Sequence, residues 1–370
     1  MENRKYALVY NFAQHYRKSI FEKMSENFQL DFYFGDKLDW APDIKKMDTR
    51  LLKGMQKELK NKRFFKYFIW QNGAVTNIFK GKYDVIILYG DAFYISNWVI
   101  LLYSRIFGKR TAIWTHGLYK DMTIGAKIFN FPFYWLANKV LLYGNYSKKK
   151  MINYGFDPKK LLVIYNSLDY ENQLSIRSRL KNDNIYLNHF GNNKPVLIYI
   201  GRVQKIKKLE QAVSALEMLK GTDHEFNLVI VGEDKEGVNL KELSESKKLN
   251  DNIWFYGSSY DEREIGNLIF NADACISPGN IGLTVIHSLV YGTPALTHKN
   301  FQNQMPEFEA IEENRTGDFF EEDDINDIVR IIKKWINLDV NERNAIRINC
   351  FQKIDSYYNP FNQINTLRKI

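Results

Sequence analysis

Short apolar runs recur along the whole chain, and the stretches between them carry apolar residues at helical spacing. We expect strands at 6–10, 30–34, 84–89, 110–115, 139–143 and 161–165, and then at 195–201, 227–232, 252–257, 273–278 and 294–297. Most of these runs are continuous rather than alternating, as in strands covered on both faces. Strands that alternate with helices predict βαβ units and parallel sheets, so the expected fold class is α/β.

The strands fall into two series, separated by a polar stretch at 170–194 that is rich in Asn, Asp, Lys and Arg. A chain of 370 residues is too long for one ordinary core and suits two domains. We therefore place one Rossmann-like domain at 1–170 and a second at 171–350.

The composition is that of an ordinary globular protein, with 45% hydrophobic and 26% charged residues. Two cysteines, Cys275 and Cys350, make neither a disulfide framework nor a metal-ligand pattern, and a reducing cytoplasm suits them. The N-terminus lacks the features of a signal peptide. Residues 85–104 are long enough to span a bilayer, but Gly90-Asp91 divides them, so we expect a buried strand followed by a core helix.

Charge is distributed unevenly along the chain. Residues 1–170 hold 28 Lys and Arg against 14 Asp and Glu, whereas residues 171–370 hold 24 against 29. Such asymmetry indicates that one face meets a polyanion, although a basic surface kept for solubility explains it as well. In the basic half, 57–70 mixes cations with aromatic residues and predicts an amphipathic helix at an anionic membrane. A core helix with a lysine-rich face is the alternative, and nucleic acid ranks last because no nucleic-acid module is present.

Two glycine-containing turns follow strands of the second half and are candidates for binding an anion. In the first, Gly201 allows a sharp turn, while Arg202 and Lys207 can neutralise a diphosphate beside a helix N-terminus. In the second, Gly279, Asn280, Ile281 and Gly282 lead into a helix that runs from Leu283 to Val290. A solvated basic loop and a tight turn without a ligand are the alternatives.

Together these segments resemble the GT-B glycosyltransferases, in particular glycosyltransferase family 4. The resemblance is strongest from 195 to 320, where Gly201, Arg202 and Lys207 stand where that family holds the donor diphosphate. Farther on, matching positions of the family's donor helix are Pro278, Gly282, Leu283 and Gly292-Thr293-Pro294.

The chain departs from the family where two glutamates are expected on that helix. Gly279 and His287 occupy those positions. By the resemblance, His287 can still form a hydrogen bond to the ribose, whereas Gly279 can offer only its backbone groups. Glu307, which follows Pro306, and Glu309 are candidates to approach the same site. The resemblance also points to His116, after the strand 110–115, as a contact of the donor sugar, where a buried or loop histidine is the alternative. His15 and Arg17 are candidates for the acceptor pocket.

The resemblance implies a GT-B fold, two Rossmann-like domains facing across a cleft, with 351–370 returning as a helix to the first domain. It implies a retaining hexosyltransferase that moves a sugar from UDP-sugar or GDP-sugar to a saccharide or lipid-linked saccharide, in surface polysaccharide biosynthesis. No metal and no other cofactor are expected, and the place implied is the cytoplasm, at the inner face of the plasma membrane. The missing glutamates keep two alternatives open: a degenerate nucleotide-binding scaffold and a sugar-nucleotide epimerase.

Overall fold

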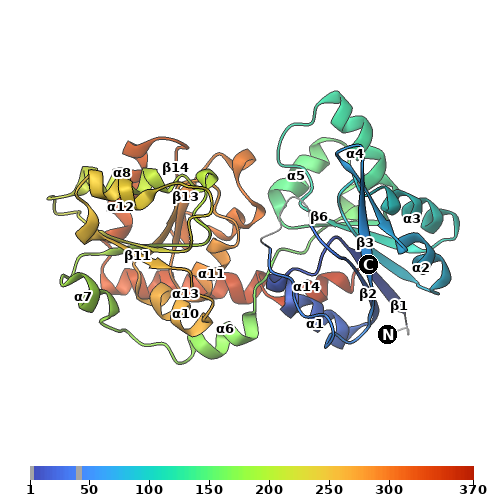
Figure 1. The fold of residues 1–370 in the computed structure, drawn as a ribbon, viewed down its shortest axis with the longest axis horizontal. Helices are drawn as coiled ribbons and strands as arrows, with labels where there is room; N and C mark the ends of the chain where they lie inside the picture. Colours follow the sequence, from blue (N-terminus) through green and yellow to red (C-terminus); the bar gives the residue numbers. More distant parts are fainter. Residues whose placement is uncertain (1–3, 39–43) are drawn as a thin grey trace. The chain divides into compact units, whose positions relative to one another are not determined.

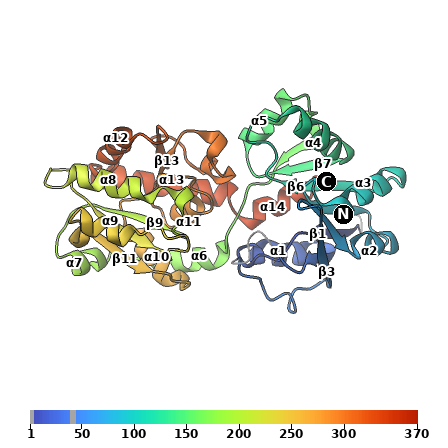
Figure 2. The ribbon, with the colours of Figure 1, turned by 45° about the horizontal axis from the view of Figure 1, so that its top comes forward.

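The computed structural model describes residues 4–38 and 44–370, which divide into two compact units. Unit 1 comprises residues up to Asp169 together with Asn359–Ile370, and unit 2 comprises Tyr170–Tyr358 (Figures 1 and 2). The predicted returning helix at 351–370 is wrong in its extent. Residues 351–357 continue a long helix of unit 2, α13 (Val340–Tyr357), and α14 (Pro360–Leu367) alone belongs to unit 1.

Within the described residues, unit 1 holds an eight-stranded sheet in the order β4-β3-β2-β1-β5-β6-β7-β8. All pairs are parallel except β3 with β4. Its strands are β1 (Lys5–Tyr10), β2 (Gln29–Gly35), β3 (Met55–Phe64), β4 (Phe68–Asn72), β5 (Val85–Tyr89), β6 (Arg110–Thr115), β7 (Lys139–Leu142) and β8 (Leu161–Val163). The helices are α1 (Lys18–Asn27), α2 (Ala74–Lys80), α3 (Ile95–Ile106), α4 (Ile124–Leu136), α5 (Asn145–Asn153) and α14.

Helices cover both faces of this sheet, which explains the continuous apolar runs. In β1, Tyr6, Leu8 and Tyr10 belong to one core cluster, while Ala7 and Val9 belong to the cluster on the opposite face. The run at 85–104 is divided as predicted, into β5 and α3. None of the described helices has the length and apolar character needed to cross a bilayer.

The prediction of a helix over 57–70 is wrong, because these residues form the antiparallel hairpin of β3 and β4. The two strands are joined by a turn in which Phe65 and Lys66 adopt left-handed backbone angles. Leu59 is the one buried residue of β3, and the other residues of this strand are partly or fully exposed. The pattern of hydrophobic and polar residues therefore carries little information on periodicity.

Unit 2 holds a parallel sheet, six-stranded within the described residues, in the order β11-β10-β9-β12-β13-β14. Its strands are β9 (Val196–Ile200), β10 (Asn227–Val231), β11 (Ile253–Gly257), β12 (Ala274–Ser277), β13 (Ala295–His298) and β14 (Gly317–Phe320). Its helices are α6 (Tyr170–Arg177), α7 (Ile185–Phe190), α8 (Leu209–Leu219), α9 (Leu240–Ser246), α10 (Glu262–Asn271), α11 (Thr284–Val290), α12 (Ile325–Ile336) and α13. The order reverses between β9 and β12, and ligands of open α/β sheets bind at such a switch point.

The ends of β9 and β10 approach each other closely at Gly232. A Cβ atom on Gly232 would lie 1.9 Å from the carbonyl oxygen of Gly201, which is backbone and cannot move away cheaply. The turn that carries Arg202 is therefore positioned by the absence of a side chain on the neighbouring strand.

We predict that Gly232→Ala lowers the free energy of unfolding by about 1–3 kcal/mol, because the added methyl group overpacks this contact. Urea denaturation followed by circular dichroism measures the change. Gly125→Ala in α4 is the control, since its added Cβ has no neighbour within 4 Å, and it should leave stability unchanged or slightly raised. Equal stability of wild-type protein and the Gly232 variant would contradict the prediction.

Candidate donor site

The loops that leave β9 and β12 meet at the switch point of unit 2. The amide of Gly279 donates to the carbonyl of Lys207 over 2.8 Å. In return, the Lys207 ammonium donates to the backbone carbonyl of Asn280 at 2.6 Å and to its side-chain Oδ1 at 2.8 Å. Backbone and side chain of one residue, Lys207, therefore connect the two predicted glycine-containing turns.

Gly279 stands at this contact because nothing larger fits there. A Cβ atom on Gly279 would lie 1.9 Å from the carbonyl oxygen of Ile206 and 2.8 Å from Lys207 backbone. Its carbonyl accepts from the Thr297 hydroxyl at 3.0 Å, and its amide is used by Lys207. Both backbone groups of Gly279 are thus committed within the protein, and the residue joins the loops.

Gln304 fixes the loop that follows β12 through hydrogen bonds of its side chain, a role that the sequence did not reveal. The buried side chain of Gln304 accepts from the amide of Ile281 at 3.0 Å and donates to Thr297 Oγ1 at 2.8 Å and to the His298 carbonyl at 3.0 Å. Thr284, the first residue of α11, donates to the carbonyl of Ile200 at 2.8 Å. These bonds fix the loop between β12 and α11 against both neighbouring strands.

Several donor groups at this junction have no acceptor within the described residues. Gly282 has φ +56°, an angle suited to glycine, and a Cβ there would lie 4.0 Å from Lys207 Nζ. Within the described residues, the amides of Gly282 and Leu283 donate to no other group, and the exposed Arg202 guanidinium has no hydrogen-bond partner. Such a set of groups suits an anion with several oxygen atoms.

The electrostatic state of Lys207 follows from its half-buried position. Burial and, less strongly, the charge of Arg202 lower the pKa of Lys207, whereas the buried carboxylate of Glu307 raises it; together they bring the pKa to about 8. Glu307, in the 3₁₀ turn Pro306–Ala310, is therefore close enough to influence the ammonium. A bound anion would favour the charged form of Lys207.

His287 is held by a carboxylate that the sequence did not point to. Its Nε2 lies 2.9 Å from Oε1 of Glu262, the first residue of α10, and the same oxygen accepts from Tyr291 and Gln173, each at 2.8 Å. Burial alone raises the pKa of Glu262, but the His287 charge and these hydrogen bonds outweigh it and hold the pKa below its ordinary value. A carboxylate thus reaches this helix from a neighbouring element.

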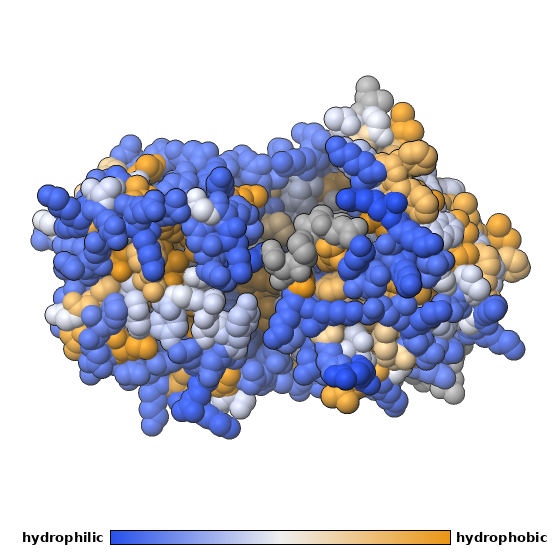
Figure 3. Space-filling view, viewed as in Figure 1, coloured by the Kyte–Doolittle hydropathy of each residue, from blue (hydrophilic) through white to orange (hydrophobic). Residues whose placement is uncertain are grey.

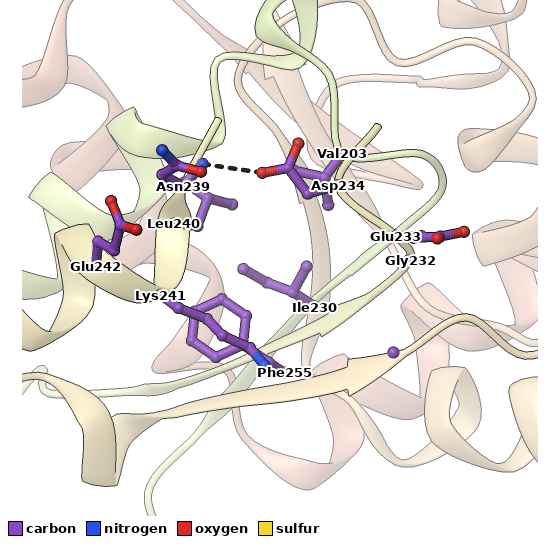
Figure 4. Close-up of a pocket in the computed structure, with 11 residues that line it drawn as sticks. Val203, Ile230, Gly232, Glu233, Asp234, Asn239, Leu240, Lys241, Glu242 and Phe255 are labelled. Carbon is purple, nitrogen blue, oxygen red and sulfur yellow. Dashed lines mark hydrogen bonds between the residues drawn. The ribbon is translucent and has the colours of Figure 1, made fainter. Parts of the chain in front are cut away.

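A cavity of about 400 Å³ opens beside the loops, at the carboxyl ends of β10 and β11. Figure 4 shows Ile230, Leu240 and Phe255 lining the space between these strands and the start of α9. Asp234 shapes the rim, because its carboxylate accepts from the amide of Asn239 at 2.9 Å. The cavity has the size and apolar walls of small-molecule sites.

In unit 1, two of the predicted residues lie around Tyr143, just after β7. His116 is exposed, and its ring centroid lies 4.9 Å from that of Tyr143. Arg17 is only 4% exposed; it donates to the Tyr143 hydroxyl, and its guanidinium lies 5.4 Å from the rings of both Tyr10 and Trp114. Arg17 is thus enclosed by aromatic rings, whereas His15 and His116 are exposed.

Comparisons with known proteins assign the fold. Residues 185–352, most of unit 2, match the family model described as "Glycosyl transferases group 1". HepE of Anabaena in complex with UDP has a TM-score of 0.73 at 14% identity, covering 99% of this chain and 98% of that one. The lipopolysaccharide outer core galactosyltransferase WaaB (0.71, 16%, covering 99% and 98%) and a glycosyltransferase of Rickettsia africae (0.71, 18%, covering 100% and 98%) are similar. No curated protein sequence matched.

The fold is therefore GT-B, as the sequence resemblance implied: two α/β units with parallel sheets, like those of HepE and WaaB. The matched segment contains both loops of the junction and the cavity beside them. No cluster of three or more His, Cys, Asp or Glu suited to a metal ion occurs among residues 4–38 and 44–370.

The lowered pKa of Lys207 gives a pH dependence with a defined sign. Below about pH 8 the ammonium is already charged, whereas above it the free protein must take up a proton to bind a diphosphate. We predict that affinity for a nucleoside diphosphate falls as pH rises through 8, by up to about tenfold per pH unit.

Isothermal titration in buffers of different ionisation enthalpy measures this uptake directly. At pH 8 the wild-type protein should take up about half a proton on binding UDP or GDP. Lys207→Arg, whose guanidinium stays charged, is the matched variant and should take up none. An affinity of the wild-type protein that is constant from about pH 7 to 9.5 would contradict the role given to Lys207.

Proposed function

We propose that this protein is a glycosyltransferase that moves a sugar from a nucleoside-diphosphate sugar to a saccharide or lipid-linked saccharide acceptor. The observation that carries the proposal is the junction at Lys207, where two cations and free amides gather at the switch point of a GT-B donor unit. Structures of similar fold include HepE in complex with UDP and with UDP-glucose, which supports a nucleotide-sugar donor.

The reaction assigned to this site breaks the bond between the anomeric carbon and the β-phosphate oxygen and joins that carbon to an acceptor hydroxyl oxygen. Arg202 and Lys207 stabilise the negative charge that develops on the departing diphosphate. The acceptor hydroxyl attacks the anomeric carbon on the face that the diphosphate leaves, and its proton passes to the leaving phosphate. Because attack and departure share one face, the configuration is retained without a protein nucleophile. With two cations neutralising the diphosphate, we expect no metal requirement, and activity should survive EDTA.

The cavity at the ends of β10 and β11 is the place proposed for the nucleoside. Its apolar residues, among them Val203, Ile230 and Phe255, suit the faces of a flat base, and it adjoins the loop that carries Arg202. His287, held by Glu262, is proposed to replace the absent glutamate beside the ribose.

The acceptor pocket and one contact to the donor sugar are proposed for unit 1. His116 is proposed to contact the sugar near the reacting carbon, and His15 to contact the acceptor. Arg17, which is buried and held by Tyr143, is proposed to support the acceptor pocket. The basic character of residues 1–170 favours an acceptor of surface polysaccharide assembly, handled in the cytoplasm at the inner face of the plasma membrane.

We predict that Arg202→Ala and Lys207→Ala each reduce transfer by at least about 100-fold, because each removes a charge from the leaving group. Lys205→Ala is the matched control: Lys205 is an exposed cation in the same loop, two residues from Lys207, and the variant should retain turnover. Product formation is followed by mass spectrometry with UDP- and GDP-sugars and several saccharide acceptors, and thermal melts verify folding.

Three outcomes would contradict the proposal. Near-wild-type turnover in either variant would remove the assigned catalytic role. Nucleotide binding without transfer to any acceptor would favour a non-catalytic scaffold. Release of free nucleoside diphosphate without a glycosylated product, with a changed sugar, would favour an epimerase.

A further inference from the structure

The hairpin formed by β3 and β4 extends beyond the sheet of unit 1. Residues up to Leu59 of β3 pair with β2, whereas Lys60–Phe64 pair with β4 and with no other described strand. The base of the hairpin is anchored, because Asn61 donates to the carbonyls of Asn11 and Lys37 and Gln71 donates to that of Tyr10. The tip of the hairpin therefore projects from an anchored base.

The tip of this hairpin exposes aromatic rings on a strained turn. Phe65 is 88% exposed, Tyr67 58% and Phe64 48%. Phe65 has φ +43° and Lys66 φ +65°, a region where Asn or Gly is usual and where a bulky side chain is uncommon. An exposed phenyl ring at such a position adds little to the stability of the fold and is available for a contact outside the chain.

Cations surround these rings on the same hairpin. Residues 57–66 include five Lys and Arg and a single acid, Glu58, which is paired with Lys46. The cations nearest the tip, Lys62, Arg63 and Lys66, are exposed.

The apolar surface continues from the hairpin onto α4. Phe93 packs against Tyr67 at 6.2 Å and against Phe129 of α4 at 5.5 Å between ring centroids. Ile128, beside Phe129, is 71% exposed. Figure 3 shows hydrophobic residues gathered over the part of unit 1 that carries α4, next to strongly hydrophilic ones.

We propose that this surface, the hairpin tip with Phe64, Phe65 and Tyr67 together with Ile128 of α4, inserts into the interface of an anionic lipid bilayer. Rings on a projecting turn enter the boundary between headgroups and acyl chains, while Lys62, Arg63 and Lys66 pair with lipid phosphates. A nucleic acid or an acidic polysaccharide would engage the cations, but the apolar surface that continues from the hairpin tip to Ile128 of α4 favours the bilayer. The inference concerns the location proposed above, not the transfer reaction.

Vesicle binding tests the surface with the full chain. Wild-type protein should co-sediment at least about tenfold more strongly with phosphatidylcholine vesicles that hold about one-third phosphatidylglycerol than with pure phosphatidylcholine. The double variant Phe65→Ser, Tyr67→Ser should lose about tenfold of that binding with its charge unchanged. Tyr260→Ser, which removes a ring of 87% exposure from unit 2, is the control and should bind as wild type.

Insertion is read separately with a polarity-sensitive fluorophore. Cys275 and Cys350 are buried, so a label can be directed to Phe65→Cys, with Tyr260→Cys as the control. Blue-shifted emission at position 65 on anionic vesicles, and none at 260, is expected. The proposal is overturned if wild-type protein ignores anionic vesicles, if position 65 stays in water when the protein binds, or if an oligonucleotide binds where vesicles do not. Turnover with a water-soluble acceptor should persist in the Phe65→Ser, Tyr67→Ser variant. A failure of the membrane proposal can therefore be distinguished from a failure of the transfer proposal.

Discussion

The backbone contact between Gly279 and Lys207 is the constraint on which the candidate donor site depends. The loops after β9 and β12 are brought together by a parallel sheet whose strand order reverses between them. Once they meet, the Lys207 ammonium is held by Asn280 and half-buried, and its lowered pKa follows. Arg202 remains outside this network and exposed.

The same contact accounts for the clearest departure of the chain from the family that it resembles. A glutamate at 279 would need the space already occupied by the backbone of Ile206 and Lys207. The close approach of the loops and a carboxylate at that position therefore exclude each other in this conformation. Near the position of the other missing glutamate, Glu262 of the preceding helix, α10, supplies a carboxylate through its contact with His287.

The sequence was sufficient for most of the fold because buried parallel strands leave a strong signal. Every strand expected from a continuous apolar run is present, from β1 to β13. The hairpin was missed because β3 buries Leu59 alone and lies near a sheet edge, so neither a two-residue nor a helical period stands out. The strand β14 was not predicted either, because it is short and its buried Asp318 interrupts the apolar run.

The site was predictable only where its residues are close together in sequence. Arg202, Lys207 and Gly282 stand in two short loops whose spacing is informative. Gln304, Glu262 and Tyr143 act on predicted residues from separate elements, and only the fold reveals those contacts. Gly279 was expected to offer backbone groups to a ligand, but the close packing of the loops has already used them.

The most direct test of the account is a crystal structure of the protein with a bound nucleoside diphosphate. The account predicts the β-phosphate within hydrogen-bonding distance of Lys207 Nζ and the Arg202 guanidinium, next to the amides of Gly282 and Leu283, with the base at the ends of β10 and β11. A diphosphate bound elsewhere, with the Lys207 ammonium hydrogen-bonded to Asn280 alone, would contradict it.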